Sequence, residues 1–353
     1  MFPVDYDAPM FPFTMTRMRP LFVAIAAGAL AAGCASVPHE PPTIYDALNA
    51  LLGADGPGAL AAMDHFDPAS LTPKRKAIID CVRGRLTGGG APNDLPPVSS
   101  ATLVAYQRYW RDAMMKTDSP AAAEAKLLAS LDAIPAMAGA KDPRSLDSVS
   151  DYAVTAIEKE GLHALTGKTQ PLYELMIWKS QETKVYDVQL PENPVKVKVV
   201  FLDQFASPGW AGWASCGVSQ TGGWAKPDAL YAVKSSYELD SESFRVSYLA
   251  HEGQHFSDYA KYPKLEQPEL EYRAKLTEIA ESDATTAELL ANFAGGGGDS
   301  RSAPHAFANR QVTFALKDVP PEQVRQAAAA KLRESSATIE RLGASTTTRF
   351  LPD

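Results

Sequence analysis

The chain has 353 residues, of which 45% are hydrophobic and 22% are charged, values that are ordinary for a globular protein. This length allows one large domain or two modest ones, with a sizeable core. The formal net charge is -8 and no long basic run occurs, so nucleic acid is not an expected partner, because phosphate binding needs clustered Lys and Arg.

Residues 1–34 have the character of an export signal. Arg17 and Arg19 precede the apolar run Leu21–Leu30, which is too short to span a bilayer and is typical of a secretory signal peptide. The run ends Leu-Ala-Ala-Gly-Cys, which resembles the lipobox of bacterial lipoproteins, although its Leu stands four residues before Cys34 and not three. The resemblance implies cleavage before Cys34 and a lipid on its sulfur. The alternative is a plain signal peptide that is cut elsewhere.

The residue after Cys34 is Ala35, and by resemblance to lipoprotein sorting rules a residue other than Asp favours the outer membrane. The resemblance therefore predicts a protein of the cell envelope that faces the periplasm and is held to the membrane through Cys34. The Pro-rich residues 35–43 are predicted to form a linker between lipid and domain.

Two further cysteines, Cys81 and Cys216, remain after Cys34. An exported protein folds in an oxidising compartment, where such a pair can form a disulfide. The sequence leaves open whether they bridge or stay as two buried thiols. A bridge would tie the N-terminal half of the chain to its C-terminal half.

Residues 44–180 are predicted to form a helical N-terminal region, because Ala, Leu, Met and Lys dominate and apolar residues recur at spacings of three and four. Pro and Gly separate the helical segments. One apolar stripe comprises Leu103, Tyr106, Tyr109, Trp110 and Met114. We interpret such stripes as the core of a helical bundle.

The pattern changes at Lys184. Val185–Val188 and Val195–Leu202 are β-branched and alternating, with a Pro-Glu-Asn-Pro turn between them, which predicts a hairpin. The segment Ala206–Lys226 is rich in Gly and Trp, and Ala229–Tyr237 predicts a further strand. A small sheet is therefore expected in this part of the chain.

Asp240 or Ser241 can cap a following helix that carries two histidines. His251 and His255 are four residues apart, so their imidazoles lie on one face of the helix and can reach one metal ion. Glu252 lies beside that pair, where it can exchange a proton with a water on the metal.

The pattern His-Glu-x-x-His resembles the active-site helix of the zincin metallopeptidases. The resemblance implies one zinc ion per chain, held by His251 and His255, with Glu252 as a catalytic residue and a peptide or protein as substrate. It also implies a zincin-like metallohydrolase domain over residues 184–342. The chain is thus predicted to be α+β and mostly helical, with an N-terminal helical bundle before a catalytic part that has a small sheet and an active-site helix.

A third protein ligand is needed if one metal position is left for water. Asp258 and Lys261 stand where the metzincin branch has Gly and a third His, so that branch is excluded. Gluzincins supply a Glu from a following helix. Glu271, with the small Ala274 three residues later, is similar to their Glu-x-x-Ala pattern and is the predicted ligand. Glu278, one helical heptad later, is the alternative metal ligand.

Asp258 lies three residues beyond the second histidine and is predicted to accept the other N–H of a zinc-bound imidazole. The alternatives are a metal ligand or a surface acid. His305 is predicted to act as a catalytic donor to the developing oxyanion, with Tyr272 and Tyr231 as other candidates. The alternative for His305 is a surface histidine at the start of a helix.

Zincins pair an extended substrate with an edge strand that precedes the active-site helix. By that analogy Ala229–Lys234 is the predicted edge strand. Trp210, Trp213 and Trp224 are predicted either to line the cleft or to pack as core.

The remaining residues are predicted to form helices and a tail. A helix opens at Pro268, two more lie near Phe307–Leu316 and Pro321–Leu342, and residues 343–353 are predicted to be a flexible tail.

Two alternatives to a peptidase stay open on the sequence. The same residues would serve another amide hydrolase that acts on cell-wall peptides. A non-catalytic envelope scaffold with a structural or decayed metal site is the other, although a purely structural site does not need Glu252. The sequence does not indicate the oligomeric state.

Overall fold

The computed structural model describes residues 43–88, 94–139, 145–226 and 228–352. The predicted signal peptide, the lipidation at Cys34 and all but the last residue of the predicted linker lie outside the described residues.

The chain divides into two compact units, and neither is one continuous stretch of sequence. The first comprises Met1–Ile177 and Ser207–Thr221, and the second comprises Trp178–Ala206 and Gly222–Asp353. The division after Ile177 falls near the change of pattern that the sequence shows at Lys184. The return of Ser207–Thr221 to the first unit was not expected.

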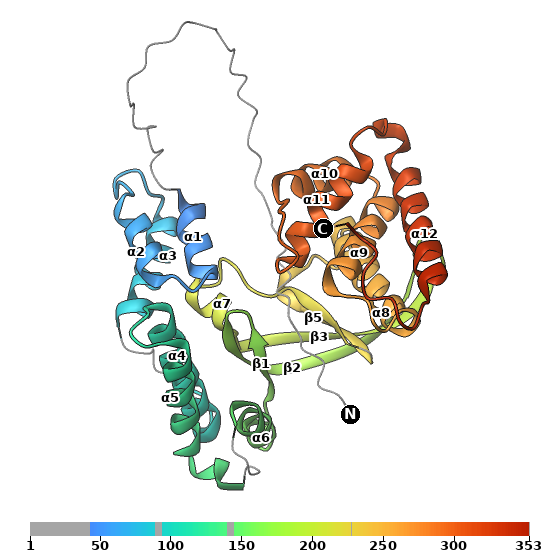
Figure 1. Cartoon of the computed structure of the whole chain (residues 1–353). Helices are drawn as coiled ribbons and strands as arrows, with labels where there is room; N and C mark the ends of the chain where they lie inside the picture. The colour runs from blue at the N-terminus through green and yellow to red at the C-terminus, as the bar shows by residue number, and fades with distance from the viewer. Residues whose placement is uncertain (1–42, 89–93, 140–144, 227, 353) are drawn as a thin grey trace, which may run out of the picture. The chain divides into compact units, whose positions relative to one another are not determined.

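The first unit is mostly helical in its described part (Figure 1). Several helices begin at a Ser or Thr whose side chain accepts a hydrogen bond from the first turn, and several have Pro in that turn. The helices are α1 (Ile44–Leu52), α2 (Gly56–Asp64), α3 (Pro73–Thr87), α4 (Pro97–Met114), α5 (Pro120–Asp132), the 3-10 turn η1 (Pro135–Gly139), α6 (Leu146–Glu158) and α7 (Trp210–Ala214).

The core of the first unit is built on the predicted apolar stripe of α4. Tyr106, Trp110 and Met114 are completely buried. The polar ends of the two aromatic side chains are satisfied, because Tyr106 Oη lies 2.8 Å from Ser150 Oγ and Trp110 Nε1 donates to the carbonyl of Tyr173. The interpretation of this stripe as core is thus confirmed.

The prediction of helix is wrong for the last part of this region, which forms strands β1 (His163–Thr169) and β2 (Leu172–Val188). A continuous apolar run such as Leu175–Trp178 of β2 is compatible with a buried strand or a buried helix on periodicity alone. Pro171 stands between the strands, and Gly167 has φ of 154°, so both residues disfavour a helix here.

Cys81 on α3 and Cys216 just after α7 form a disulfide. Both residues belong to the first unit. The bridge therefore holds the returning segment Ser207–Thr221 within that unit. It links the N-terminal half of the sequence to the C-terminal half, as expected, but it does not link the two compact units. The same segment buries Trp213, whose carbonyl accepts a hydrogen bond from Arg85 on α3.

Glu174 on β2 holds the start of α7. Its buried carboxylate accepts hydrogen bonds from the backbone N–H groups of Leu175 and Trp210, at 3.0 and 2.8 Å. Burial raises the pKa of Glu174 to about 7, although these hydrogen bonds act in the opposite direction. Gly209 has φ of 93°, and a Cβ there would lie 2.5 Å from this carboxylate, so only glycine fits.

The second unit contains the remaining strands and the C-terminal helices (Figure 1). They are β3 (Val195–Pro208), β4 (Gly223–Lys226), β5 (Ala229–Val233), the 3-10 turn η2 (Lys234–Ser236), the π-helix η3 (Phe244–Ala250), α8 (His251–Lys261), α9 (Gln267–Glu281), α10 (Thr286–Gly295), α11 (Pro304–Leu316), the 3-10 turn η4 (Pro321–Gln323) and α12 (Val324–Leu342).

The strands form one five-stranded mixed sheet in the order β1-β2-β3-β5-β4. β5 pairs parallel with β3, with Phe201 opposite Ala232, and antiparallel with β4, with Trp224 opposite Tyr231. The prediction of an α+β, mostly helical chain is therefore confirmed. The prediction that Ala229–Lys234 is the edge strand is wrong, because the Gly- and Trp-rich segment adds β4 outside it.

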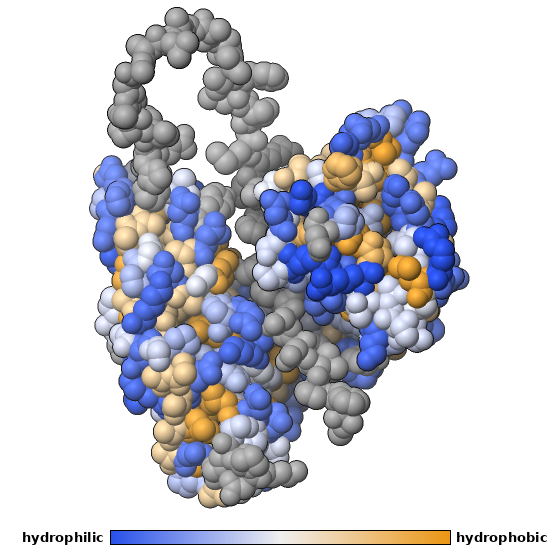
Figure 2. Space-filling view, in the orientation of Figure 1, coloured by the Kyte–Doolittle hydropathy of each residue, from blue (hydrophilic) through white to orange (hydrophobic). Residues whose placement is uncertain are grey.

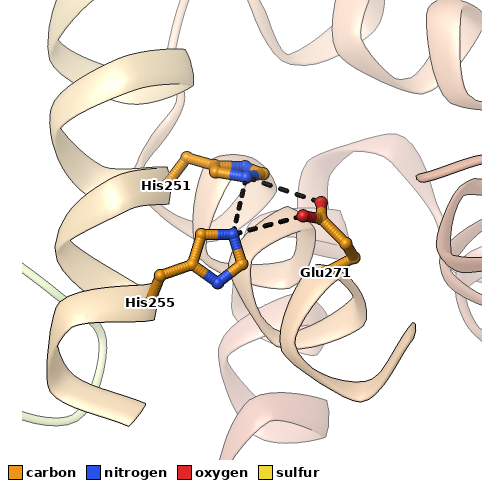
Figure 3. A group of neighbouring side chains, drawn as sticks. All are labelled: His251, His255 and Glu271. Atoms are coloured by element: carbon orange, nitrogen blue, oxygen red, sulfur yellow. Dashed lines mark hydrogen bonds and ion pairs between the residues drawn. The ribbon is translucent and has the colours of Figure 1, made fainter. Parts of the chain in front are cut away.

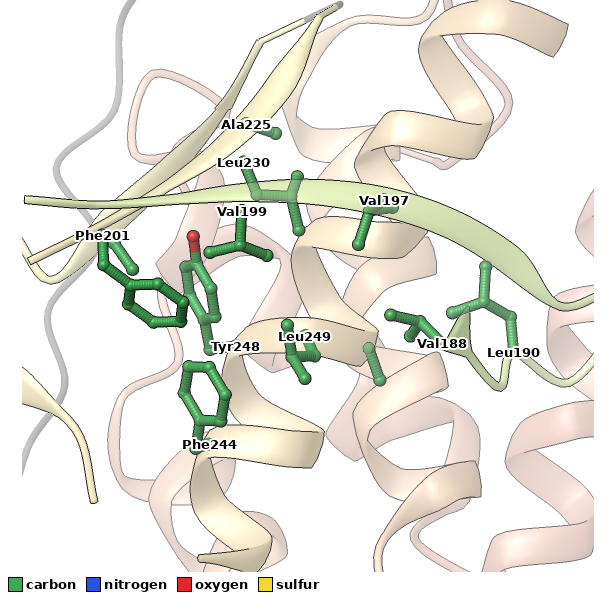
Figure 4. Packing of buried hydrophobic residues seen from close by; sticks show 12 residues of the cluster. Val188, Leu190, Val197, Val199, Phe201, Ala225, Leu230, Phe244, Tyr248 and Leu249 are labelled. Atoms are coloured by element: carbon green, nitrogen blue, oxygen red, sulfur yellow. The ribbon is translucent and has the colours of Figure 1, made fainter. Parts of the chain in front are cut away.

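A buried apolar cluster joins one face of the sheet to η3 (Figure 4). Val199 and Phe201 of β3 and Leu230 of β5 face Phe244 and Tyr248 of η3. The two aromatic rings of η3 stack with their centroids 5.4 Å apart. Because η3 continues directly into α8, this packing fixes the start of α8 beneath the sheet.

The C-terminal residues, predicted to be a flexible tail, pack against the start of α9. The backbone N–H of Glu266 donates to the carbonyl of Thr348, and Arg349 Nε lies 2.7 Å from both carboxylate oxygens of Glu266. Phe350 packs edge-on against Tyr272. The apolar residues Phe350 and Leu351, in a segment that is otherwise polar, account for the difference.

Within the described ranges, no helix is both long enough and apolar enough to cross a membrane. On the face drawn in Figure 2, hydrophilic residues are interspersed with smaller hydrophobic areas.

Replacing Cys81 and Cys216 together by Ser should lower the free energy of unfolding by about 2–5 kcal/mol, because the bridge closes a long loop in the unfolded chain. Urea unfolding of the oxidised wild type and of the double variant measures the difference. Reduced wild type should match the variant. Equal stability of oxidised and reduced wild type would contradict the prediction.

Glu174→Gln should remove a pH dependence of stability. The pKa of Glu174 is near 4.5 in the unfolded chain and about 7 in the folded protein. Its contribution to the free energy of unfolding is therefore complete below about pH 4.5, and it falls by up to about 3 kcal/mol as the pH rises from there through about 7. Glutamine keeps an acceptor for both N–H groups and does not titrate. Urea unfolding at about pH 5 and about pH 7.5 tests this; parallel losses in both proteins would refute it.

Candidate metal centre

The π-helix η3 and the α-helix α8 bring two histidines to the centre of the second unit. Ser241 Oγ accepts the backbone N–H of Phe244, so the predicted cap is present. η3 has the wide turn of a π-helix, which the sequence did not predict and which is frequent near functional sites. His251 and His255 follow in regular α-helix and are 2% and 3% exposed.

α9 packs alongside α8 and supplies a carboxylate. Almost every residue of α9 is buried, and the small Ala274 is completely buried. The face of α9 toward α8 presents Glu271 and, two turns later, Glu278. Both carboxylates contact the histidines of α8.

His251, His255 and Glu271 form a tight buried group (Figure 3). The Nε2 atoms of the two histidines lie 3.1 Å apart. Glu271 Oε1 lies 3.4 Å from His255 Nε2, and Glu271 Oε2 lies 3.6 Å from His251 Nε2. Figure 3 shows both rings turned toward this carboxylate. The sequence predicted these three residues as one ligand set, and the structure brings them together.

The spacing of these atoms fits a metal ion. Atoms bound about 2 Å from a tetrahedral zinc ion lie about 3.3 Å from one another. The two nitrogens are 3.1 Å apart, and each lies 3.4 or 3.6 Å from a different oxygen of Glu271, so all three separations are close to that value. Two imidazoles and one carboxylate also match the protein ligands that zinc takes when a fourth position is kept open. The residues present therefore fit the group that the sequence motif implies.

Glu278 contacts the opposite side of His251. Its Oε1 lies 2.6 Å from His251 Nδ1, the ring nitrogen that faces away from the other two ligands. A carboxylate in this position fixes the tautomer and the orientation of the ring, so that Nε2 faces the metal position. Glu278 thus fixes the ring of His251, and the geometry favours Glu271 over Glu278 as the third ligand of a bound metal.

Glu252 is completely buried, and neither of its carboxylate oxygens has a hydrogen-bond partner among the described residues. Burial raises its pKa to about 8; the nearby His255 acts to lower it, and Glu271 and Glu278 raise it further. An ionised carboxylate without partners is costly in the protein interior. A positive charge at the ligand group would favour its ionised form.

The pKa values of the three residues in this group shift in different directions. Burial lowers the pKa of His251, which favours the neutral imidazole, the form that binds metals. Burial acts the same way on His255, but hydrogen bonding and charge attraction from Glu271 outweigh it and raise the pKa. Burial alone would raise the pKa of Glu271, but attraction to His305 and His255 brings it well below its usual range.

Asp258 does not take the predicted place beside a histidine. Its carboxylate pairs with Arg273, through Nε at 2.8 Å and through a second nitrogen at 2.9 Å, and accepts Gln254 Nε2 at 2.9 Å. His255 Nδ1 has no hydrogen-bond partner in the described part of the chain. The prediction considered only the spacing along α8 and could not foresee that α9 brings a buried arginine to Asp258.

His305, at the start of α11, lies against the ligand carboxylate. Its Nδ1 is 2.8 Å from Glu271 Oε2, and its side chain is 26% exposed. The imidazole is therefore adjacent to the metal ligands, and its role as a donor to substrate stays a prediction. Of the other candidate donors, Tyr231 donates its hydroxyl to Asp228, and the ring of Tyr272 packs against Phe350.

The tryptophans of the Gly-rich segment have separate places. Trp210 and Trp213 are buried in α7 of the first unit, so for these two residues the core alternative is correct. Trp224 lies on β4. Gly253, between the two histidines, would place a Cβ 3.3 Å from Val188 and 3.4 Å from Val195, so the end of the β2–β3 hairpin passes close to α8 there.

Comparisons of the chain with protein-family models, with curated proteins and with solved structures each found no match. The function is therefore inferred from the geometry of the site itself.

Glu271→Gln should remove stoichiometric zinc binding, whereas Glu278→Gln should retain it with an affinity reduced by roughly 10- to 100-fold, because Glu278 acts through His251. Competition of each metal-free variant with a chromophoric chelator for added zinc measures both effects. The reverse order, with binding lost in Glu278→Gln and kept in Glu271→Gln, would reassign the third ligand.

Proposed function

We propose that this chain is a zinc-dependent hydrolase, and specifically a metallopeptidase. The observation that carries the proposal is the buried group of His251 Nε2, His255 Nε2 and the Glu271 carboxylate. Its nitrogens are 3.1 Å apart, and each lies 3.4 or 3.6 Å from one of the two carboxylate oxygens, close to the ligand separations of a tetrahedral zinc site. Two of these residues, His251 and His255, belong to the His-Glu-x-x-His motif that resembles the zincin helix, and this supports the same proposal.

Zinc bound by these ligands would supply Lewis-acid polarisation of a substrate carbonyl and of a water. Glu252 is the group that moves the proton: it takes one from the attacking water and delivers it to the leaving amine. Its burial without other partners among the described residues keeps the carboxylate available for that task. His305, beside Glu271, is the candidate donor to the oxyanion that develops on the carbonyl.

A peptide is the favoured substrate because an edge strand accompanies the site. β4 is the edge of the sheet on this side and packs against α8. An extended peptide can add to such an edge through backbone hydrogen bonds. By resemblance to zincins, β4 takes the role that the sequence had assigned to Ala229–Lys234.

The proposed location is the cell envelope, with a lipid on Cys34 that holds the protein to the outer membrane on its periplasmic side. The lipobox-like sequence supports the anchor. The disulfide between Cys81 and Cys216 supports an oxidising compartment.

A hydrolase of cell-wall peptides would use the same residues. The two functions differ only in the substrate that is cleaved, so only cleavage assays with different substrates distinguish them. A non-catalytic scaffold is disfavoured by Glu252, because a structural zinc site has no use for a buried, unpaired acid next to its ligands.

Glu252→Gln should bind zinc at one equivalent, as the wild type does, but cleave peptides roughly 100- to 10,000-fold more slowly, because it removes the proton-transfer group without touching a ligand. Metal analysis and cleavage of a peptide library by both proteins test this. Zinc-loaded wild type that cleaves no peptide in a Glu252-dependent manner would refute the peptidase.

A further inference from the structure

A second set of polar contacts joins α8 to α9 beside the candidate metal centre. Arg273 of α9 is completely buried and binds both carboxylate oxygens of Asp258 on α8, at 2.8 and 2.9 Å. Gln254 Nε2 donates to the same carboxylate at 2.9 Å, and Thr277 Oγ1 donates to Gln254 Oε1 at 3.0 Å. These four side chains, Gln254, Asp258, Arg273 and Thr277, are called the α8–α9 clamp.

The clamp residues alternate with the residues of the metal centre on both helices. Gln254 directly precedes His255, and Thr277 directly precedes Glu278. Arg273 follows Glu271 by two residues. Each clamp contact is therefore anchored within one turn of a residue that forms the metal centre.

Such a clamp controls how far one helix is displaced along the other. An apolar helix interface tolerates small shifts, whereas hydrogen bonds weaken steeply when their lengths or angles change. A zinc site accepts deviations of only about 0.2 Å in its ligand distances. A slip of even a fraction of the helical rise per residue would separate the histidines from Glu271, so directional contacts between the helices are needed.

The composition of the clamp indicates positioning more than stability. Burying an ion pair such as Arg273–Asp258 carries a desolvation cost that the attraction between the two charges barely offsets. Apolar side chains of similar volume often stabilise a protein equally or more. Arg273 is held in turn by Ser335 and Ser336 of α12. The ion pair is thus a fixed point to which both helices of the metal centre are attached.

We infer that Gln254, Asp258, Arg273 and Thr277 are positioning residues that set the register of α8 against α9 and thereby the affinity of the metal centre. This inference rests on the proposed function, because it requires that zinc binds at His251, His255 and Glu271. None of the four touches the metal position.

Thr277→Val tests the inference, because valine keeps the shape of threonine and removes the donor to Gln254. We expect a zinc affinity roughly 10-fold lower than that of the wild type, as for other groups that hold ligands in place. Thr277→Ser, which restores the hydroxyl, should bind zinc within about two-fold of the wild type. Gln254→Met provides a second break in the clamp and should also weaken binding.

The matched control is Ser282→Ala, which removes a buried hydroxyl at the end of α9. This hydroxyl donates to the carbonyl of Ile279 on α9 and lies 2.8 Å from Thr286 Oγ1 on α10, so these two contacts do not involve α8. Its thermal unfolding temperature should fall while its zinc affinity stays the same. Chelator competition and thermal unfolding of metal-free protein are measured on every variant of the full chain.

Zinc affinity that stays within about two-fold of the wild type in both Thr277→Val and Gln254→Met, whatever their thermal stability, would overturn the positioning role. Wild type that binds no zinc would instead overturn the proposed function, and with it this inference. The two failures are distinguished within one experiment.

Discussion

The burial of several acids beside imidazoles is the constraint on which the second unit depends. Glu252, Glu271 and Glu278 are at most 5% exposed, and ionised carboxylates are stable in a protein interior only with opposite charge or hydrogen bonds nearby. Arg273 is engaged with Asp258 and does not neutralise them. Imidazoles contact Glu271 and Glu278, whereas Glu252 has no hydrogen-bond partner among the described residues. A divalent cation at the site would add positive charge beside Glu252, so binding and folding of this unit are expected to be coupled.

Local sequence spacing was sufficient for the part of the site that lies on one helix. The pair His251 and His255, with Glu252 between them, needed only the 3.6-residue period of an α-helix. Glu271 also lies beside the two imidazoles, as the resemblance to a known pattern led us to expect, and its role as a metal ligand stays a prediction. The neighbour of His251 was missed: Glu278 was proposed as a rival ligand, but its contact on the far ring nitrogen depends on ring orientation.

Features that depend on tertiary pairing could not be predicted in the same way. The charged partner of Asp258, Arg273, is fifteen residues away on another helix, and spacing along α8 carries no information on it. β4 is short and rich in glycine and tryptophan, which is typical of a loop, and it becomes a strand only because β5 pairs with it. Phe350 packs because Tyr272 offers an apolar surface. The prediction of a flexible tail considered only the polar composition of residues 343–353 and could not include this contact.

The passage of the chain between the two units has a consequence for how the protein can be divided. The chain enters the second unit inside β2, leaves it for Ser207–Thr221 and re-enters at Gly222. A fragment that starts at Lys184 would cut a strand, leave Cys216 without its partner thiol and expose the tryptophans of α7. We therefore expect a misfolded product when either half is truncated, removed by proteolysis or exchanged for part of another protein. Each half needs the other in the same chain.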